Sequence, residues 1–126
     1  MVRREVIIHD LESWIESWID NNINSSLRID DVVKRSGYSK WYLQKMFSVV
    51  KKKTLWRYIR DLKLFKAACD LVYSDETIIA ISLKYGYDSQ SSFTRTFTQN
   101  YVFPPSEFRR LCRDNPGITK EMLKNR

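Results

Sequence analysis

Residues 37–47 read GYSKWYLQKMF, and residues 86–97 repeat the same plan as GYDSQSSFTRTF. Each copy follows a short segment whose apolar residues recur at helical spacing, at 29–33 and at 78–82. A short helix, a glycine turn, a serine cap and a second helix with polar side chains together predict a helix-turn-helix. The chain is therefore expected to contain two such units, about fifty residues apart.

The two copies keep a common register. Four pairs of equivalent residues lie fifty positions apart: Ser39/Ser89, Leu43/Phe93, Lys45/Arg95 and Phe47/Phe97. The two turn glycines, Gly37 and Gly86, lie forty-nine apart, so the second turn has one extra residue. We expect both glycines to adopt the positive φ that such a turn needs, and Ser39, Thr54 and Ser89 to cap the helices that follow them.

Hydrophobic periodicity predicts an all-α chain with about seven helices and no strand. The helices are expected at residues 10–23, 29–36, 40–50, 55–73, 78–84, 89–99 and 105–113. The first is amphipathic, with one apolar face made by Leu11, Trp14, Ile15, Trp18, Ile19 and Ile23. Further core candidates are Leu43, Met46, Phe47, Val50, Leu55, Ile59, Leu62, Cys69 and Val72.

The domain organisation follows from these elements. Residues 55–73 contain no Gly or Pro and are expected to form a stiff connector helix. The connector separates an N-terminal helix-turn-helix subdomain at 1–54 from a C-terminal one at 74–113. Residues 114–126 have little apolar content and are expected to be a fraying tail.

The net charge of +7 is unevenly distributed. Residues 1–33 hold three basic and seven acidic side chains, residues 34–66 hold eleven and one, and residues 67–126 hold eight and seven. The three nets are −4, +10 and +1. A basic segment of this kind suits a polyanion, because neutralising phosphates releases counterions and supplies affinity for any sequence. The alternative is a solvated charged face, but the same segment carries a helix-turn-helix.

Enzymatic, metal-binding and membrane functions find no support in the residues. His9 is the sole histidine, at the edge of the first expected helix, where a surface or capping role fits best. Three glycines cannot build a phosphate loop or a nucleophile elbow. Cys69 and Cys112 lack metal spacing and are expected to be free thiols. We therefore expect no catalysis, no cofactor, no metal, no membrane span and no export signal.

DNA reading fits the residue types on the second helix of each unit. The outward positions are Lys40, Trp41, Gln44 and Lys45 in the first unit, and Gln90, Ser91, Thr94 and Arg95 in the second. Arg or Lys can donate to guanine, Gln can pair with adenine, and Trp or a Thr methyl can pack on a thymine methyl. Any amphipathic helix has a polar face, but the shared register of the two faces favours base reading.

At this point the chain resembles the AraC/XylS transcription activators, most closely the MarA, SoxS and Rob branch. The resemblance rests on the two quoted segments and on PP--FR at 104–109, and it runs from about residue 8 to 113. It implies a cytoplasmic bacterial, nucleoid-associated activator of stress-response or multidrug-resistance genes that also contacts RNA polymerase. It further implies a monomer whose two recognition helices enter successive major-groove segments, about 34–36 Å apart.

Carried over by position, the resemblance implies base contacts by Trp41, Gln44, Lys45, Gln90, Ser91, Ser92, Thr94 and Arg95. Three residues depart from the family pattern. Lys45 replaces an arginine and loses its fork geometry, Ser91 replaces a glutamine, and Ser82 replaces a small alanine and can bond to its own helix backbone.

We predict a sequence-specific activator that binds double-stranded promoter DNA as a monomer. Because few residues precede the first unit, no small-molecule effector domain is expected. Phosphate contacts are expected from Ser39, Arg57, Arg60, Lys63, Ser89 and Arg109. The alternatives are a basic architectural or RNA-binding protein without sequence preference, and an interaction module that binds polymerase alone.

Overall fold

The computed structural model describes residues 3–21 and 28–124, except for the side chains at 19–21. Within these residues the chain forms eight α-helices, one short 3-10 helix and no strand. The all-α class is thereby confirmed, with one helix more than the sequence predicted. The fold divides into two compact units, residues 1–62 and 63–126, and helix α4 contributes to both.

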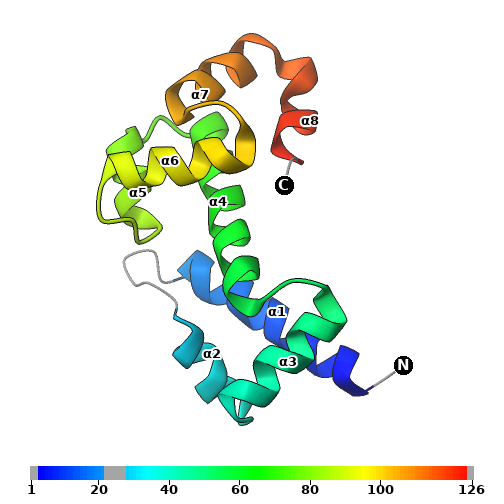
Figure 1. The fold of residues 1–126 in the computed structure, drawn as a ribbon. Helices are drawn as coiled ribbons and strands as arrows, with labels where there is room; N and C mark the ends of the chain where they lie inside the picture. Colours follow the sequence, from blue (N-terminus) through cyan, green and yellow to red (C-terminus); the bar gives the residue numbers. More distant parts are fainter. Residues whose placement is uncertain (1–2, 22–27, 125–126) are drawn as a thin grey trace. The chain divides into compact units, whose positions relative to one another are not determined.

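The first unit is a small helical cluster. It contains α1 (Arg3–Asn21), α2 (Ile29–Ser36), α3 (Lys40–Lys51) and the start of α4 (Leu55–Tyr73). Helix α1 packs against both α2 and α3, and α2 packs on α3 (Figure 1). The helices expected at 29–36 and 55–73 are confirmed, and the one at 40–50 runs one residue further. Thr54 caps α4 as expected, because its hydroxyl accepts a hydrogen bond from the Arg57 N–H at 3.1 Å.

Helix α1 begins earlier than predicted, at Arg3 rather than at residue 10. Ile8 is buried and extends the stripe of Leu11 and Ile15 by one turn toward the N-terminus. His9 is therefore an exposed residue inside a helix, not at its edge. The predicted helix end at residue 23, and the core roles of Ile19 and Ile23, lie outside the described side chains.

The core of the first unit combines aliphatic side chains with one phenylalanine. It is formed by Ile8, Leu11, Ile15, Val32, Leu43, Met46, Phe47, Leu55 and Ile59. Val50, expected in the core, is only half-buried. Tyr58 packs edge-on against Phe47 with ring centroids 5.3 Å apart. Burial, with the charges of Glu12 and Glu16, raises the pKa of Tyr58 to about 12, so its phenol stays neutral in this core.

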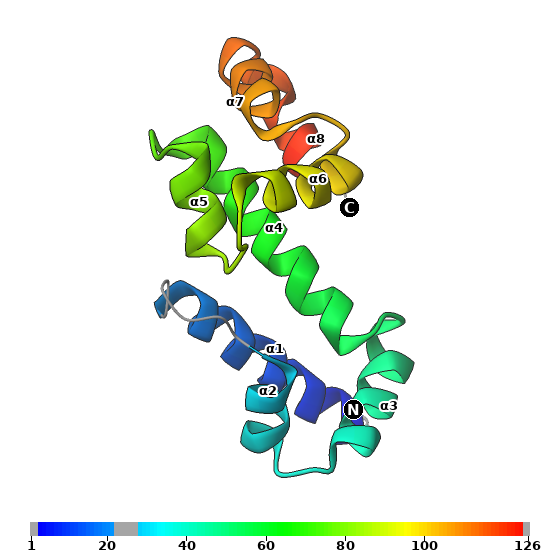
Figure 2. The same ribbon diagram turned by 60° about the vertical axis from the view of Figure 1, so that its left-hand side comes forward.

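The second unit is built around aromatic side chains. Beyond the second half of α4 it contains α5 (Ile78–Lys84), α6 (Gln90–Tyr101), α7 (Pro105–Asp114), a 3-10 turn (Pro116–Ile118) and α8 (Thr119–Leu123) (Figure 2). Phe97 is central: its ring lies 5.6 Å from Phe93, 4.8 Å from Tyr101 and 5.2 Å from Phe108, centroid to centroid. These rings join α6 to α7. The expected helix at 78–84 is confirmed. Helix α6 ends two residues after its predicted end, and α7 ends one residue after its predicted end.

The prediction of the buried face on the second half of α4 is wrong. Cys69, Val72 and Leu62 were expected in the core but are only half-buried. The buried residues are instead Leu64, Ala67, Ala68 and Leu71. The two alanines do not stand out in a hydrophobic pattern, yet a small side chain allows close packing on a helix. The helix therefore uses one face in the first unit and a rotated face in the second.

The prediction that the chain frays after residue 114 is also wrong. Residues 116–123 fold into the 3-10 turn and α8, which pack against α7. Thr119 is buried, and its hydroxyl donates to the Cys112 carbonyl at 2.9 Å. The Cys112 sulfur also lies 3.7 Å from the Met122 sulfur. A polar bond and one sulfur contact hold this segment, which explains why apolar content alone did not reveal it.

Replacing Thr119 with Val tests this docking. Val keeps the shape of the side chain but loses the bond to the Cys112 carbonyl, so the free energy of unfolding should fall by about 1 kcal/mol. Lys120→Ala at the exposed neighbouring position is the control and should change it by less than about 0.5 kcal/mol. Urea unfolding measures both. Equal, negligible effects would mean that α8 does not dock in solution.

Candidate nucleic-acid interface

The turn of the first helix-turn-helix has the predicted glycine conformation. Gly37 ends α2 with φ at +78°, and its N–H donates to the Val33 carbonyl at 3.2 Å. A side chain there would meet no atom within 4 Å, so the left-handed backbone, not space, requires glycine. The Ser39 hydroxyl then accepts a hydrogen bond from the Tyr42 N–H at 3.2 Å. This cap fixes where α3 starts, and with it which side chains face outward.

The outward face of α3 carries the side chains predicted to read bases. Leu43, Met46 and Phe47 are buried, so helical geometry turns the opposite positions to solvent. Trp41 is 68% exposed and therefore does not pack in the core. Lys40 and Lys45 are also exposed, and Gln44 is half-buried.

Two interactions order side chains on this face. The Lys45 ammonium lies over the Trp41 ring, 4.9 Å from its centroid. The Lys40 ammonium pairs with the Asp30 carboxylate of α2 at 3.1 Å, with both side chains largely exposed. An exposed pair of this kind contributes little stability. Lys40 is thus one predicted base contact that the chain partly neutralises by itself.

The second helix-turn-helix follows the same plan. Gly86 adopts φ of +86°, as predicted. The Ser89 hydroxyl accepts a hydrogen bond from the Ser92 N–H at 3.1 Å and caps α6. Thr77 caps α5 by accepting from the Ala80 N–H at 3.1 Å. This cap was missed, although a Thr directly before an apolar helical run is a recognised start signal.

Helix α6 exposes smaller side chains than α3. Phe93, Phe97 and Tyr101 are buried. On the outward face, Gln90, Ser91 and Arg95 are exposed, and Ser92 and Thr94 are half-buried. An open depression is lined by Gln90, Ser91, Thr94 and Arg95. The structure therefore brings together the predicted base-reading residues of each unit on one helix face.

The cations predicted to bind phosphate differ in their solvent exposure and in their contacts within the fold. Arg57 is exposed. Arg60 donates to the Asp61 carboxylate at 3.0 Å and lies 5.2 Å from the Trp56 ring, while Lys53 reaches the same carboxylate at 3.1 Å. Lys63 is half-buried, and burial lowers the pKa of its ammonium. Part of the positive charge in residues 34–66 is thus used within the fold.

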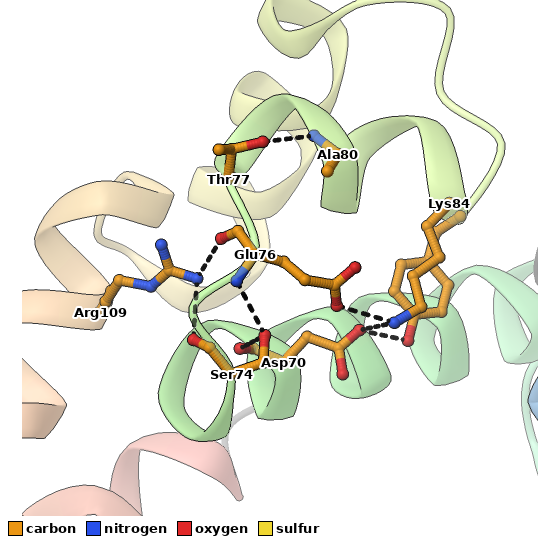
Figure 3. Close-up of polar contacts among 8 residues, drawn as sticks. Asp70, Ser74, Glu76, Thr77, Ala80, Lys84 and Arg109 are labelled. Atoms are coloured by element: carbon orange, nitrogen blue, oxygen red, sulfur yellow. Dashed lines mark hydrogen bonds and ion pairs between the residues drawn. The ribbon is translucent and has the colours of Figure 1, made fainter.

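A charged network fixes the turn between α4 and α5. Lys84 of α5 pairs with Asp70 at 2.9 Å and with Glu76 at 3.0 Å, and the Tyr85 hydroxyl donates to Asp70 at 2.7 Å (Figure 3). Partial burial acts to lower the pKa of Lys84, but the hydrogen bonds and charges of Asp70 and Glu76 outweigh it and raise that pKa. Sequence reasoning missed this network because its members lie up to fifteen positions apart.

Arg109 is held by backbone carbonyls of the same turn. Its guanidinium donates to the carbonyls of Ser74 at 3.3 Å and Glu76 at 2.6 Å (Figure 3). It also donates to the Leu71 carbonyl at 2.8 Å. Arg113 donates to the Val72 carbonyl at 3.3 Å and the Ser74 carbonyl at 2.5 Å. Cations at the C-terminal end of a helix satisfy its free carbonyls and complement its dipole. Both arginines therefore cap α4, and a phosphate role for Arg109 competes with this cap.

The structure also describes the environment of the polar residue Ser82 and of the two cysteines. Ser82 is fully buried, and its hydroxyl donates to the Ile78 carbonyl at 2.8 Å, as predicted for this polar replacement. Cys112 is buried and Cys69 is half-buried, and both are free thiols. In the described part of the chain no three metal-ligating side chains cluster, and no helix is long and apolar enough to span a membrane.

Comparisons with known proteins agree with this geometry. A family model described as a helix-turn-helix domain matches residues 32–111. Regulatory protein SoxS of Escherichia coli strain K12 is 45% identical over 103 residues, covering 82% of this chain and 92% of SoxS. Multiple antibiotic resistance protein MarA of Salmonella typhimurium is 39% identical over 104 residues, covering 82% of this chain and 79% of MarA.

A solved structure gives the same fold. An AraC-type DNA-binding transcriptional regulator from Chromobacterium violaceum superposes with a TM-score of 0.79 at 26% identity. The match covers 90% of this chain and 96% of that one. The fold is therefore that of a DNA-binding domain over nearly the whole chain.

Replacing Arg109 with Gln separates its two roles. As a cap with three charge-assisted bonds, Arg109 should support the fold, so the variant should lose at least about 2 kcal/mol of unfolding free energy. Arg110→Gln is the matched control, because Arg110 is exposed and its ion pairs with Glu107 at 3.8 Å and Asp114 at 3.9 Å contribute little stability. Urea unfolding gives the comparison. Unchanged stability together with a weaker salt dependence of DNA binding would instead identify a phosphate contact.

Proposed function

The chain belongs to the AraC/XylS family of transcription regulators, in the branch that contains MarA and SoxS, and we propose that it activates promoters as a monomer through α3 and α6. The family consists of DNA-binding regulators, which confirms the prediction that the chain is not an enzyme.

One observation carries the proposal: a rigidly capped helix in each unit exposes side chains suited to base edges. The exposed indole of Trp41 is the clearest case, because it lies on the outward face of α3 beside Lys45 and offers a large apolar surface to a partner. In the major groove a thymine methyl supplies that partner. Two different reading helices in one chain do the work of a dimer of single units, so the bound site should be asymmetric.

The proposed contacts follow the exposed faces. Base contacts are assigned to Lys40, Trp41, Gln44, Lys45, Gln90, Ser91, Ser92, Thr94 and Arg95. Arg95 can fork onto guanine, and Gln44 and Gln90 can pair with adenine. Phosphate contacts are assigned to Ser39, Arg57, Arg60, Lys63 and Ser89, with Arg57 the most accessible cation of the set. Arg109 is left out because three carbonyls hold it.

The biological setting is proposed from the relatives. One relative is named as a multiple antibiotic resistance protein, which supports resistance or stress-response genes as targets. Recruitment of RNA polymerase, and work in the bacterial cytoplasm at the nucleoid, complete the proposal. The basic segment at 34–66 favours one rival, a basic protein that binds nucleic acid without sequence preference.

Selection of bound duplexes from a random pool tests the proposal against this rival. We expect an asymmetric consensus with two separate conserved blocks, and one protein chain per site by sedimentation. The rival predicts no enrichment. A consensus with two-fold symmetry, or two chains per site, would contradict the monomer model.

The variant Arg95→Ala tests whether α6 reads one of the two conserved blocks of the consensus. The variant should lose about 1–3 kcal/mol at a single base pair and tolerate other bases there. Arg110→Ala removes an exposed arginine of α7 and should leave the selected sequence unchanged. If Arg95→Ala keeps full affinity and selects the same consensus, α6 does not read bases as proposed.

A further inference from the structure

Trp41 and Lys45 are in contact before any DNA is bound. They lie four positions apart, so they share one face of α3. The Lys45 ammonium lies 4.9 Å from the centroid of the Trp41 ring. Both side chains are exposed, and Lys45 has no carboxylate partner within the described residues. The ring is therefore the group that orders the ammonium.

This contact has a physical consequence for recognition. A free lysine has four rotatable bonds and loses rotamer entropy when it is fixed on a base. An indole has only two side-chain torsions, and its face attracts a cation. A lysine already held over the ring has lost part of that entropy in the free protein. The indole thus supplies some of the fixed geometry that the planar fork of an arginine has by itself.

The second unit provides an internal comparison. Because the two copies are offset by fifty residues, Trp41 and Lys45 correspond to Ser91 and Arg95. Ser91 offers no ring, and within the described residues no aromatic ring lies over the Arg95 guanidinium. Arg95 nevertheless lies at the same spacing on an equally capped helix. The two pairs therefore differ in side-chain chemistry but not in backbone context.

We propose that Trp41 and Lys45 form one coupled base-reading unit, whereas Ser91 and Arg95 contribute independently. The indole edge packs on a thymine methyl, and the ammonium that it holds donates to an acceptor atom of a neighbouring base pair. The inference rests on the proposed function, because it concerns how α3 performs the reading assigned to it. It adds that affinity at these two positions depends on both residues together.

A double-mutant cycle on the selected duplex measures the coupling. Dissociation constants are needed for Trp41→Leu, Lys45→Met and the double variant, and in parallel for Ser91→Ala, Arg95→Met and their double. We expect the double variant of α3 to lose affinity about two- to fivefold less than the product of its single losses, the range for an exposed cation–π contact. The α6 losses should multiply.

Two further measurements remove the remaining ambiguity. Lys45→Arg keeps a cation that can stack on the Trp41 ring. In this variant, Trp41→Leu should therefore still cost as much affinity as it does beside Lys45, whereas beside Lys45→Met it should cost less. In the free protein, NMR should show ring-current shifts of the Lys45 ε-methylene protons that disappear in Trp41→Leu. Thermal melting confirms that each variant is folded, as expected for exposed positions.

The possible results separate this inference from the proposed function. Single losses that simply multiply in α3 would overturn the coupling while leaving DNA reading by α3 intact. A double loss larger than the product would overturn it as well, because it would mean that binding breaks the stack. Folded single variants that bind as well as the wild type would overturn the proposed function, and the coupling with it.

Discussion

The burial of one stripe on each of α3 and α6 is the constraint on which the rest of the candidate site depends. Leu43 and Phe47 in α3, and Phe93 and Phe97 in α6, are fully buried. An α-helix repeats every 3.6 residues, so burying these positions leaves the opposite ones in solvent. The serine caps set where each helix begins. The outward faces of α3 and α6 are thus a consequence of core packing, and a shift of one residue in either helix would replace every outward side chain.

Some cations of this chain bind groups within the fold, and others remain exposed to solvent. Within the basic segment, Lys51 pairs with Glu12 at 2.7 Å, and Lys53 and Arg60 share Asp61. In the second unit Arg109 and Arg113 of α7 donate to backbone carbonyls at the end of α4 and in the turn that follows it. These cations stabilise the two units. The net charge of a segment therefore overstates the number of cations available to phosphates, and Arg57 is the most exposed of the predicted phosphate-binding cations.

Most of the fold was predictable because it is specified locally. The turn glycines, the caps Ser39, Thr54 and Ser89, and the bounds of α2, α4 and α5 follow from short patterns that act within a few residues. The Thr77 cap and the early start of α1 were missed although they are local, but the other missed features depend on distant contacts. Arg109 caps α4 across more than thirty positions. Helix α8 is held by a bond from Thr119 to α7, and the buried face of α4 changes to alanines that carry no strong hydrophobic signal.

The proposed function requires that the exposed faces of α3 and α6 together bind specific DNA. NMR titration with the selected duplex tests it most directly, by following the Trp41 indole N–H and the side-chain amides of Gln44 and Gln90. All three signals should shift in the same titration and saturate at one chain per duplex. Shifts confined to the lysine and arginine side chains of residues 51–66, with these three signals unchanged, would contradict the proposed function.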